Sequence, residues 1–236
     1  MNFHQKFITT ILLLFAAQKT MVTYGQSKIH LGVNTEIGAK LYPIKYYNVF
    51  ASIQPSVLMR IEDEQYNKIG LILSLGLHID QARYKLVKES TPASKAYIDM
   101  THHNLSFTGL VTFPTRNESL KILAGIGAEY ALESNVAYAW TGANSIGFIQ
   151  ESPELDSLQK KVDANLAKIL PAVCLGIQYH FPRAPRVKFY CLYRQNLLNS
   201  FTENIPVYII ITGKNDQAPT NYRPSYLKLG LSYDFW

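Results

Sequence analysis

The sequence predicts an all-β protein, an eight-stranded antiparallel up-and-down transmembrane β-barrel, on three observations. Segments in which apolar side chains alternate with small or polar ones recur along the chain, and a period of two is typical of strands with one apolar face. After residue 25, no apolar stretch approaches the ~20 residues that a spanning helix needs. Short polar links between the segments alternate with longer ones, as the turns and loops of membrane barrels do.

Residues 1–25 are interpreted as a signal peptide. Lys6 precedes an apolar core at residues 7–17, which is too short to span a membrane as a helix. Thr23 and Gly25 are small enough to flank a cleavage before Gln26. The alternative is a buried N-terminal helix. The mature barrel domain is therefore expected to cover residues 26–236.

The alternation predicts eight strands in order. The third is the clearest, because leucines and isoleucines at every second position face glycine, serine and histidine. Pro55 is a flaw in the second, since proline cannot donate a ladder hydrogen bond. The last strand should close the barrel by pairing with residues 28–42. The expected strands cover residues 29–41, 49–61, 69–80, 104–113, 120–130, 169–181, 187–194 and 226–235.

The two longest connections are residues 133–163 and 199–223. In the first, Ser152 and Pro153 resemble a helix start, and the apolar residues that follow have helical spacing. We expect a short amphipathic helix there, with its apolar stripe formed by Leu155, Leu158, Val162 and Leu166. In the second, residues 207–211 are apolar and β-prone, and form either a strand extension or an exposed contact surface.

Every second residue of a strand lies on the same face, so the position of a residue along its strand, its parity, predicts whether it faces the lumen or the lipid. By this parity a set of charged side chains lies on the polar face of the strands. An eight-stranded barrel is only wide enough inside for its own side chains, and buried charges must be paired or hydrated. The mixed signs therefore predict a salt-bridged, water-containing plug and a barrel that conducts poorly. The predicted lumenal charge network is Glu36, Lys40, Arg60, Asp80, Lys121, Glu129, Lys168, Lys188, Arg194, Lys228 and Asp234.

The last strand carries a predicted insertion signal in its outward residues: Leu227, Leu229, Leu231, Tyr233, Phe235 and Trp236. Together with the signal peptide, the alternating strands and the short turns, residues 230–235 (Gly-Leu-Ser-Tyr-Asp-Phe) resemble the PorT-like outer-membrane β-barrel family of Bacteroidota. The resemblance covers the mature chain as a pattern. It implies a place in the bacterial outer membrane, contact with its lipid, and recognition of the last strand by the barrel-insertion machinery. Trp236 departs from this pattern, as one residue beyond the usual last outward aromatic.

The sequence gives little support to the hypothesis of a catalytic site. His102, Ser106 and Glu129 point inward by parity, whereas a lipid substrate approaches from outside. His103 faces outward but has no serine near it on that face, and a nucleophile needs a base within hydrogen-bond reach. We therefore expect no catalytic, cofactor or metal site, and a lumenal hydrogen-bond network instead.

Two cysteines, Cys174 and Cys191, fall on strands expected to form a hairpin. A turn centred near Ala184 puts them on opposite faces and forbids a disulfide, whereas a tighter turn makes them direct partners. Free thiols are favoured.

The net charge is +6 without a Lys/Arg run, which argues against nucleic acid as a partner. The sequence favours a structural, adhesive, assembly or secretion-associated role exercised through the long loops, with another envelope protein as a candidate partner, and disfavours an open pore. The alternatives are a secreted lipocalin-like barrel that binds a small ligand and, behind it, a lipid-modifying barrel enzyme.

Overall fold

The computed structural model describes residues 27–41, 47–48, 51–63, 69–91, 94–141, 146–149, 153–202, 205–209, 214–218 and 223–235. The predicted signal peptide lies outside the described residues, as do Ser152 and Trp236.

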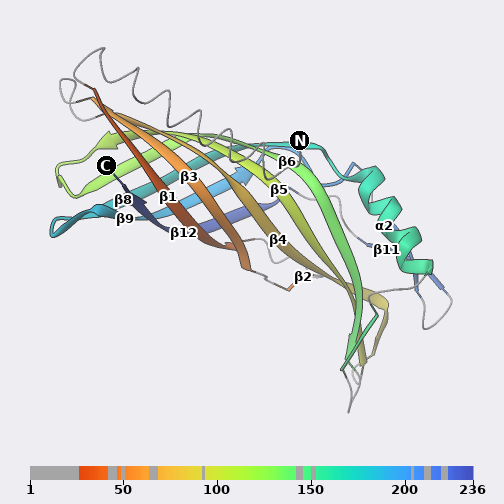
Figure 1. The fold of residues 1–236 in the computed structure, drawn as a ribbon. Coiled ribbons are helices and arrows are strands. Elements are labelled where there is room, and N and C mark those ends of the chain that lie inside the picture. Colours follow the sequence, from red (N-terminus) through yellow and green to blue (C-terminus); the bar gives the residue numbers. More distant parts are fainter. Residues whose placement is uncertain are drawn as a thin grey trace.

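Eight strands close into an antiparallel barrel, which confirms the predicted fold class (Figure 1). The closing pair joins the first strand to the last, from Gly32 opposite Asp234 to Lys40 opposite Tyr226, as expected from the sequence. The barrel strands are β1 (Ser27–Lys40), β3 (Ala51–Asp63), β4 (Gly70–Thr91), β5 (Ser94–Pro114), β6 (Leu120–Thr141), β8 (Ile169–Phe181), β9 (Ala184–Asn196) and β12 (Ser225–Asp234).

The two ends of the barrel differ. The strands β3, β5, β8 and β12 finish at one end, where β1 starts, and we name this the turn end. The connections from β6 to β8 and from β9 to β12 are longer and lie at the other end, which we name the extended end. The connection from β4 to β5 at that end is only residues 92–93, because the two strands extend into the link expected from the sequence.

A belt of apolar side chains faces outward around the barrel. Its middle is aliphatic, and Ile126 and Leu175 are 67% and 59% exposed. Aromatic side chains border it, with Phe113, Tyr179, Phe181, Tyr233 and Phe235 towards the turn end and Tyr130 and Tyr193 towards the extended end. A lipocalin-like barrel would carry this stripe inside, so the structure argues against that alternative.

The height of the belt fits a bilayer. Tyr130 lies ten residues along β6 from Leu120, which is opposite Tyr179 of β8. About ten residues span ~33 Å of strand, and a tilt of ~40° reduces this to ~25 Å, the height of the apolar band of membrane barrels.

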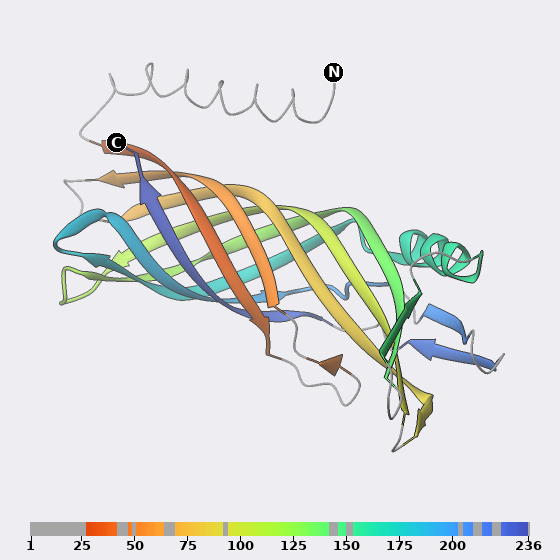
Figure 2. The ribbon, with the colours of Figure 1, turned by 60° about the horizontal axis from the view of Figure 1, so that its bottom comes forward.

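Three neighbouring strands continue far beyond the barrel (Figure 2). β4, β5 and β6 have 22, 21 and 22 residues, whereas β12 has 10. The excess of about ten residues, ~30 Å, forms a sheet outside the barrel at its extended end. Two short strands join this sheet, β2 (Tyr47–Asn48) beside β4 and β7 (Ile146–Ile149) beside β6. We name this sheet, with the helix against it, the platform.

The platform corrects two expectations from the sequence. Residues 133–141 were expected in a loop but belong to β6. Residues 81–103 fall between two of the expected strands but belong almost wholly to β4 and β5. Between the pairs His103–Glu133 and Asn104–Ala131, Leu132 is an extra residue that forms a β-bulge. Bulges bend a strand and reverse its facing pattern, so this one marks the place where the sheet leaves the barrel wall.

The predicted helix is present as α2 (Pro153–Asn165), which lies against β6. Its expected apolar stripe, Leu155, Leu158, Val162 and Leu166, is buried. Residues 207–209 of the β-prone segment belong to β10 (Ile205–Ile209), which pairs with β11 (Lys214–Ala218). Residues 210–211 of that segment lie outside the described residues. Among the described helices, none is long and apolar enough to cross a membrane.

Candidate functional site: a filled lumen and a vestibule

The structure brings the predicted lumenal charges together, with one exception. Ten of the eleven are buried: Glu36, Lys40, Arg60, Asp80, Lys121, Glu129, Lys188, Arg194, Lys228 and Asp234. Lys168 was expected among them but is exposed, because β8 begins only at Ile169 and the residue stands outside the strand pattern. The alternation of residues does not show where a strand begins, so it could not show that Lys168 lies before the first residue of β8.

Glu129 organises the lumen near the extended end. One of its oxygens lies 2.7 Å from His78 Nδ1 and 3.2 Å from Arg194 Nη2. Glu129 and Arg194 are each 1% exposed, so their charges face each other without solvent screening. Arg194 also donates a hydrogen bond to Ser106 Oγ at 3.2 Å. A second pair closer to the rim joins Lys40 to Asp80 at 2.8 Å, and Tyr226 donates to Asp80 at 3.1 Å.

Glu36 holds the middle of the lumen. Lys228 lies 3.4 Å from it and donates to Gln54 at 2.5 Å, and the Tyr190 hydroxyl donates to Glu36 at 3.0 Å. Strand β12 lies between β1, which carries Glu36, and β9, which carries Tyr190. Gly230 of β12 is the direct neighbour of both residues in the sheet, and the Tyr190 side chain crosses over it to reach Glu36. A side chain at that position would block the reach.

Gly230→Ala is therefore expected to destabilise the barrel. A Cβ at Gly230 would stand 2.2 Å from the Tyr190 ring, so the ring must move and its hydrogen bond to Glu36 is lost. Overpacking of this kind costs about 1–3 kcal/mol. Urea titration of the barrel in lipid vesicles, followed by the gel mobility of the folded form, measures the change.

The matched control is Gly109→Ala, whose Cβ would meet only Leu73 Cδ2 at an ordinary 3.5 Å. Equal urea midpoints for the two alanine variants would contradict the role of Gly230.

Near the turn end, Asp234 accepts from Lys188 and lies 3.6 Å from Arg60 Nε. Arg60 also donates to Gln178 at 2.7 Å. Closer to the rim, Lys121 donates to Glu62 at 2.9 Å. The charges of the lumen are thus neutralised in separate layers along its length.

Sequence reasoning singled out the charged lumenal residues and missed two other kinds. The neutral partners, His78, Gln54, Tyr190 and Gln178, share the inward parity and could have been found by it. The second kind is an apolar layer formed by Ile72, Leu110, Leu123, Cys174, Tyr190 and Leu192. It is invisible to a search for polar residues, because it breaks the alternation on which that search depends.

This apolar layer leaves little space. The void at mid-barrel, lined by Glu36, Tyr190 and the leucines, measures about 20 Å³. A cavity needs about 10–15 Å³ on this measure to hold one water molecule. The plug predicted from the sequence is therefore drier at its centre than expected.

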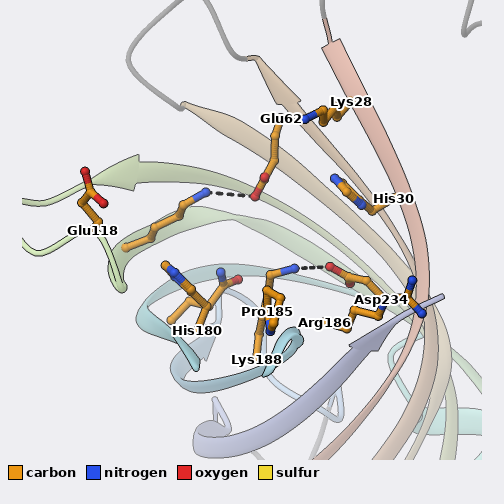
Figure 3. A pocket seen from close by; sticks show the side chains of 11 residues that line it. Lys28, His30, Glu62, Glu118, His180, Pro185, Arg186, Lys188 and Asp234 are labelled. Carbon is orange, nitrogen blue, oxygen red and sulfur yellow. Dashed lines mark hydrogen bonds and ion pairs between the residues drawn. The ribbon is translucent and has the colours of Figure 1, made fainter. Parts of the chain in front are cut away.

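A larger cavity opens at the turn end (Figure 3), and we name it the vestibule. Its volume is about 460 Å³. Three carboxylates line it, from Glu62, Glu118 and Asp234. Its basic lining residues outnumber them: Lys28, His30, Lys121, His180, Arg186 and Lys188. Residues far apart in the chain meet here because the starts or finishes of several barrel strands converge at one rim.

The extended end of the lumen is covered. Phe201 is fully buried, and its ring packs edge-on against His102, with 5.6 Å between centroids. The Phe201 segment is held in place by Thr202, whose backbone N donates to the Asn165 carbonyl at the end of α2 at 3.0 Å. Ser134 of β6 donates to Asp163 of α2 at 2.8 Å, which fastens the helix to the sheet.

On the platform, Arg83 and Asp99 form a two-pronged ion pair with both contacts at 2.5 Å. Arg83 also lies over the Tyr97 ring, 5.2 Å from its centroid. The hydrogen bonds that Arg83 donates to Asp99 raise the pKa of Arg83 above its ordinary value. Both side chains are about one-quarter exposed, so the pair orients the hairpin more than it stabilises it.

The residues weighed for catalysis do not form a catalytic set. Ser106 is buried and accepts a hydrogen bond from Arg194, while His102 packs against Phe201. Glu129 is held by His78 and Arg194. In the described part of the chain, no three His, Cys, Asp or Glu side chains are grouped to hold a metal ion.

Cys174 and Cys191 are both free. In the ladder Cys174 is opposite Arg194 and Cys191 is opposite Ile177, which corresponds to the turn centred near Ala184. Cys174 is buried in the lumen and Cys191 faces outward, so the two thiols lie on opposite sides of the wall.

The sequence matches no protein-family model and no curated protein. Similar solved structures include Neisserial surface protein A, with 15% identity over 90% of this chain and 100% of that one, at a TM-score of 0.32. Ail, the attachment invasion locus protein of Yersinia pestis, shows 14% identity over 89% and 97% of the chains, at 0.30. The outer membrane protein OprG from Pseudomonas aeruginosa shows 11% over 89% and 95%, at 0.32. At these scores the assignment of the fold rests on the strand pairing itself.

Proposed function

We propose that this chain is an integral outer-membrane β-barrel that anchors a folded platform on the cell surface. The observation that carries the proposal is the closed barrel wall, with its apolar belt outside and its paired charges inside. The hydrocarbon of a bilayer is the medium that suits such an apolar belt. A closed barrel also leaves no unpaired strand edge inside the bilayer. In this proposal the turn end faces the periplasm and the platform faces the medium.

The proposed role is structural or adhesive, or concerns assembly of another envelope protein, and it is not conduction. The apolar layer at mid-barrel and the ion pairs on both sides of it argue against a continuous water path through the lumen. The platform, in contrast, has a buried core of its own, which includes Ile98 and Met100 of β5 and the apolar stripe of α2. A folded surface held rigidly away from the membrane suits recognition of a partner better than a set of short loops does.

The proposal includes export by the signal peptide at residues 1–25 and recognition of the outward residues of β12 by the barrel-insertion machinery. Leu227, Leu229, Leu231, Tyr233 and Phe235 are exposed on the wall, which supports this recognition. We further propose that the chain is a PorT-like barrel of Bacteroidota. The support for this assignment is residues 230–235, in which Gly230 has a packing role.

Cysteine labelling tests the topology. Lys160→Cys on α2 and Arg183→Cys in the β8–β9 turn both replace exposed side chains. In intact cells a membrane-impermeant maleimide should label the first variant and spare the second, which should react only after the outer membrane is permeabilised. The wild type is the background control, because Cys174 is buried in the lumen and Cys191 faces the lipid.

The reverse labelling pattern, or labelling of both sites in intact cells, would sink the proposed orientation. Replacing the maleimide by a crosslinker at Lys160→Cys then captures the partner of the platform for identification.

A further inference from the structure

We propose that the vestibule at the turn end is a binding site for a small ligand that carries phosphate-like oxyanions. The site is separate from the platform, so this inference does not depend on the role proposed for that surface. The argument rests on the floor of the cavity, its walls and its size.

The floor of the vestibule holds a buried hydrogen-bond donor, the amide nitrogen of Gln178, that lacks an acceptor. Gln178 lines the vestibule and is 1% exposed, and its Oε1 accepts from Arg60 Nη1 at 2.7 Å. Because a guanidinium can only donate, this contact fixes the amide with its oxygen towards Arg60 and its NH₂ group away from it. Gln178 Nε2 then has no hydrogen-bond acceptor among the described residues. Buried donors without partners are costly, and an oxyanion supplies acceptors.

The deep carboxylates do not cancel this preference. Asp234 is already bound by Lys188 and faces Arg60, and Glu62 is bound by Lys121. Each is therefore neutralised by a cation of its own. The rim adds Arg186 and His180, which line the same cavity from the two strands of one hairpin. A guanidinium at the rim can bind two oxygens of a phosphate side by side.

The size limits the ligand. A volume of about 460 Å³ lies within the range of small-molecule sites, about 300–1,000 Å³. Above the floor lies the apolar layer, which does not favour passage of a charged ligand into the barrel. Two sources can supply the chemistry, a soluble phosphorylated compound of the periplasm or the headgroup of an anionic phospholipid at the rim.

Calorimetric titration with inorganic pyrophosphate tests the site on the full barrel in zwitterionic detergent. Saturable binding with one site per chain is expected. Arg186→Gln should weaken it about tenfold, as expected for the loss of one charge-assisted hydrogen bond. His180→Gln should weaken it as well. Arg186 is exposed, so its replacement leaves the fold intact, and Lys168→Gln at the other end of the barrel is the matched control of equal charge change.

The outcomes separate the possibilities. Absence of saturable binding overturns the proposal, as does an equal loss of affinity in the Lys168→Gln control. If adding phosphatidylglycerol to the micelles abolishes pyrophosphate binding, the site is occupied by lipid headgroups. If pyrophosphate still binds, the site takes a soluble ligand.

Discussion

Glu129→Ala should destabilise the barrel more than any other single change of a lumenal charge. The substitution leaves Arg194 buried without its counter-ion, and His78 loses its partner at 2.7 Å. Removal of one member of a buried ion pair costs about 3–5 kcal/mol. Urea titration in lipid vesicles, read from the gel mobility of the folded form, should show the loss as a lower midpoint.

The matched control for this variant is Glu133→Ala, four residues along the same strand, where the side chain is exposed. The double variant Glu129→Gln with Arg194→Met should recover much of the stability, since no uncompensated charge is left inside. A Glu129→Ala barrel that unfolds at the wild-type urea concentration would show that water reaches this pair.

Leu229→Arg should have the second large effect. Leu229 is 49% exposed and lies midway along β12, opposite Ile37 on one side and Cys191 on the other. In a bilayer an arginine near the midplane costs about 2–4 kcal/mol. In water the same change to an exposed leucine would be almost neutral, so the variant also discriminates a membrane barrel from a secreted one.

Leu198→Arg is the control for this variant, because Leu198 is 50% exposed and lies beyond the end of β9. Folding yields into vesicles should fall for Leu229→Arg and remain unchanged for Leu198→Arg. Equal yields would place the belt outside the hydrocarbon.

The barrel could be predicted from the sequence because a bilayer requires apolar residues on the outer face of each strand and permits polar residues on the inner face. A strand between lipid and a polar lumen must alternate, and residues 69–80 do so except at Ile72, which belongs to the apolar layer. Beyond Asp80 the same strand leaves the membrane and loses that alternation, so residues 81–91 resemble a link although they continue β4. The extra residue Leu132 has the same effect in β6, because it reverses the facing pattern where the platform begins.

The lumenal network shows the same limit. Parity identified the charges but not their partners, since pairing depends on the depth of each residue and on side-chain reach across the barrel. Tyr190 reaches Glu36 only because Gly230 lies between them. The vestibule could not be predicted at all, because its walls come from the ends of strands distant in sequence.

The unbroken strands that join the platform to the barrel have a mechanical consequence. A partner that pulls on the platform away from the cell loads β4, β5 and β6 along their length. The ladder hydrogen bonds run across the strands, so they resist such a force in shear, many at a time. A short loop under the same tension would pass the force to the hydrogen bonds of its end residues one after another. In the proposed adhesive role, the platform and its barrel anchor would bear such a force as one continuous unit, which suits a bond that must hold under flow.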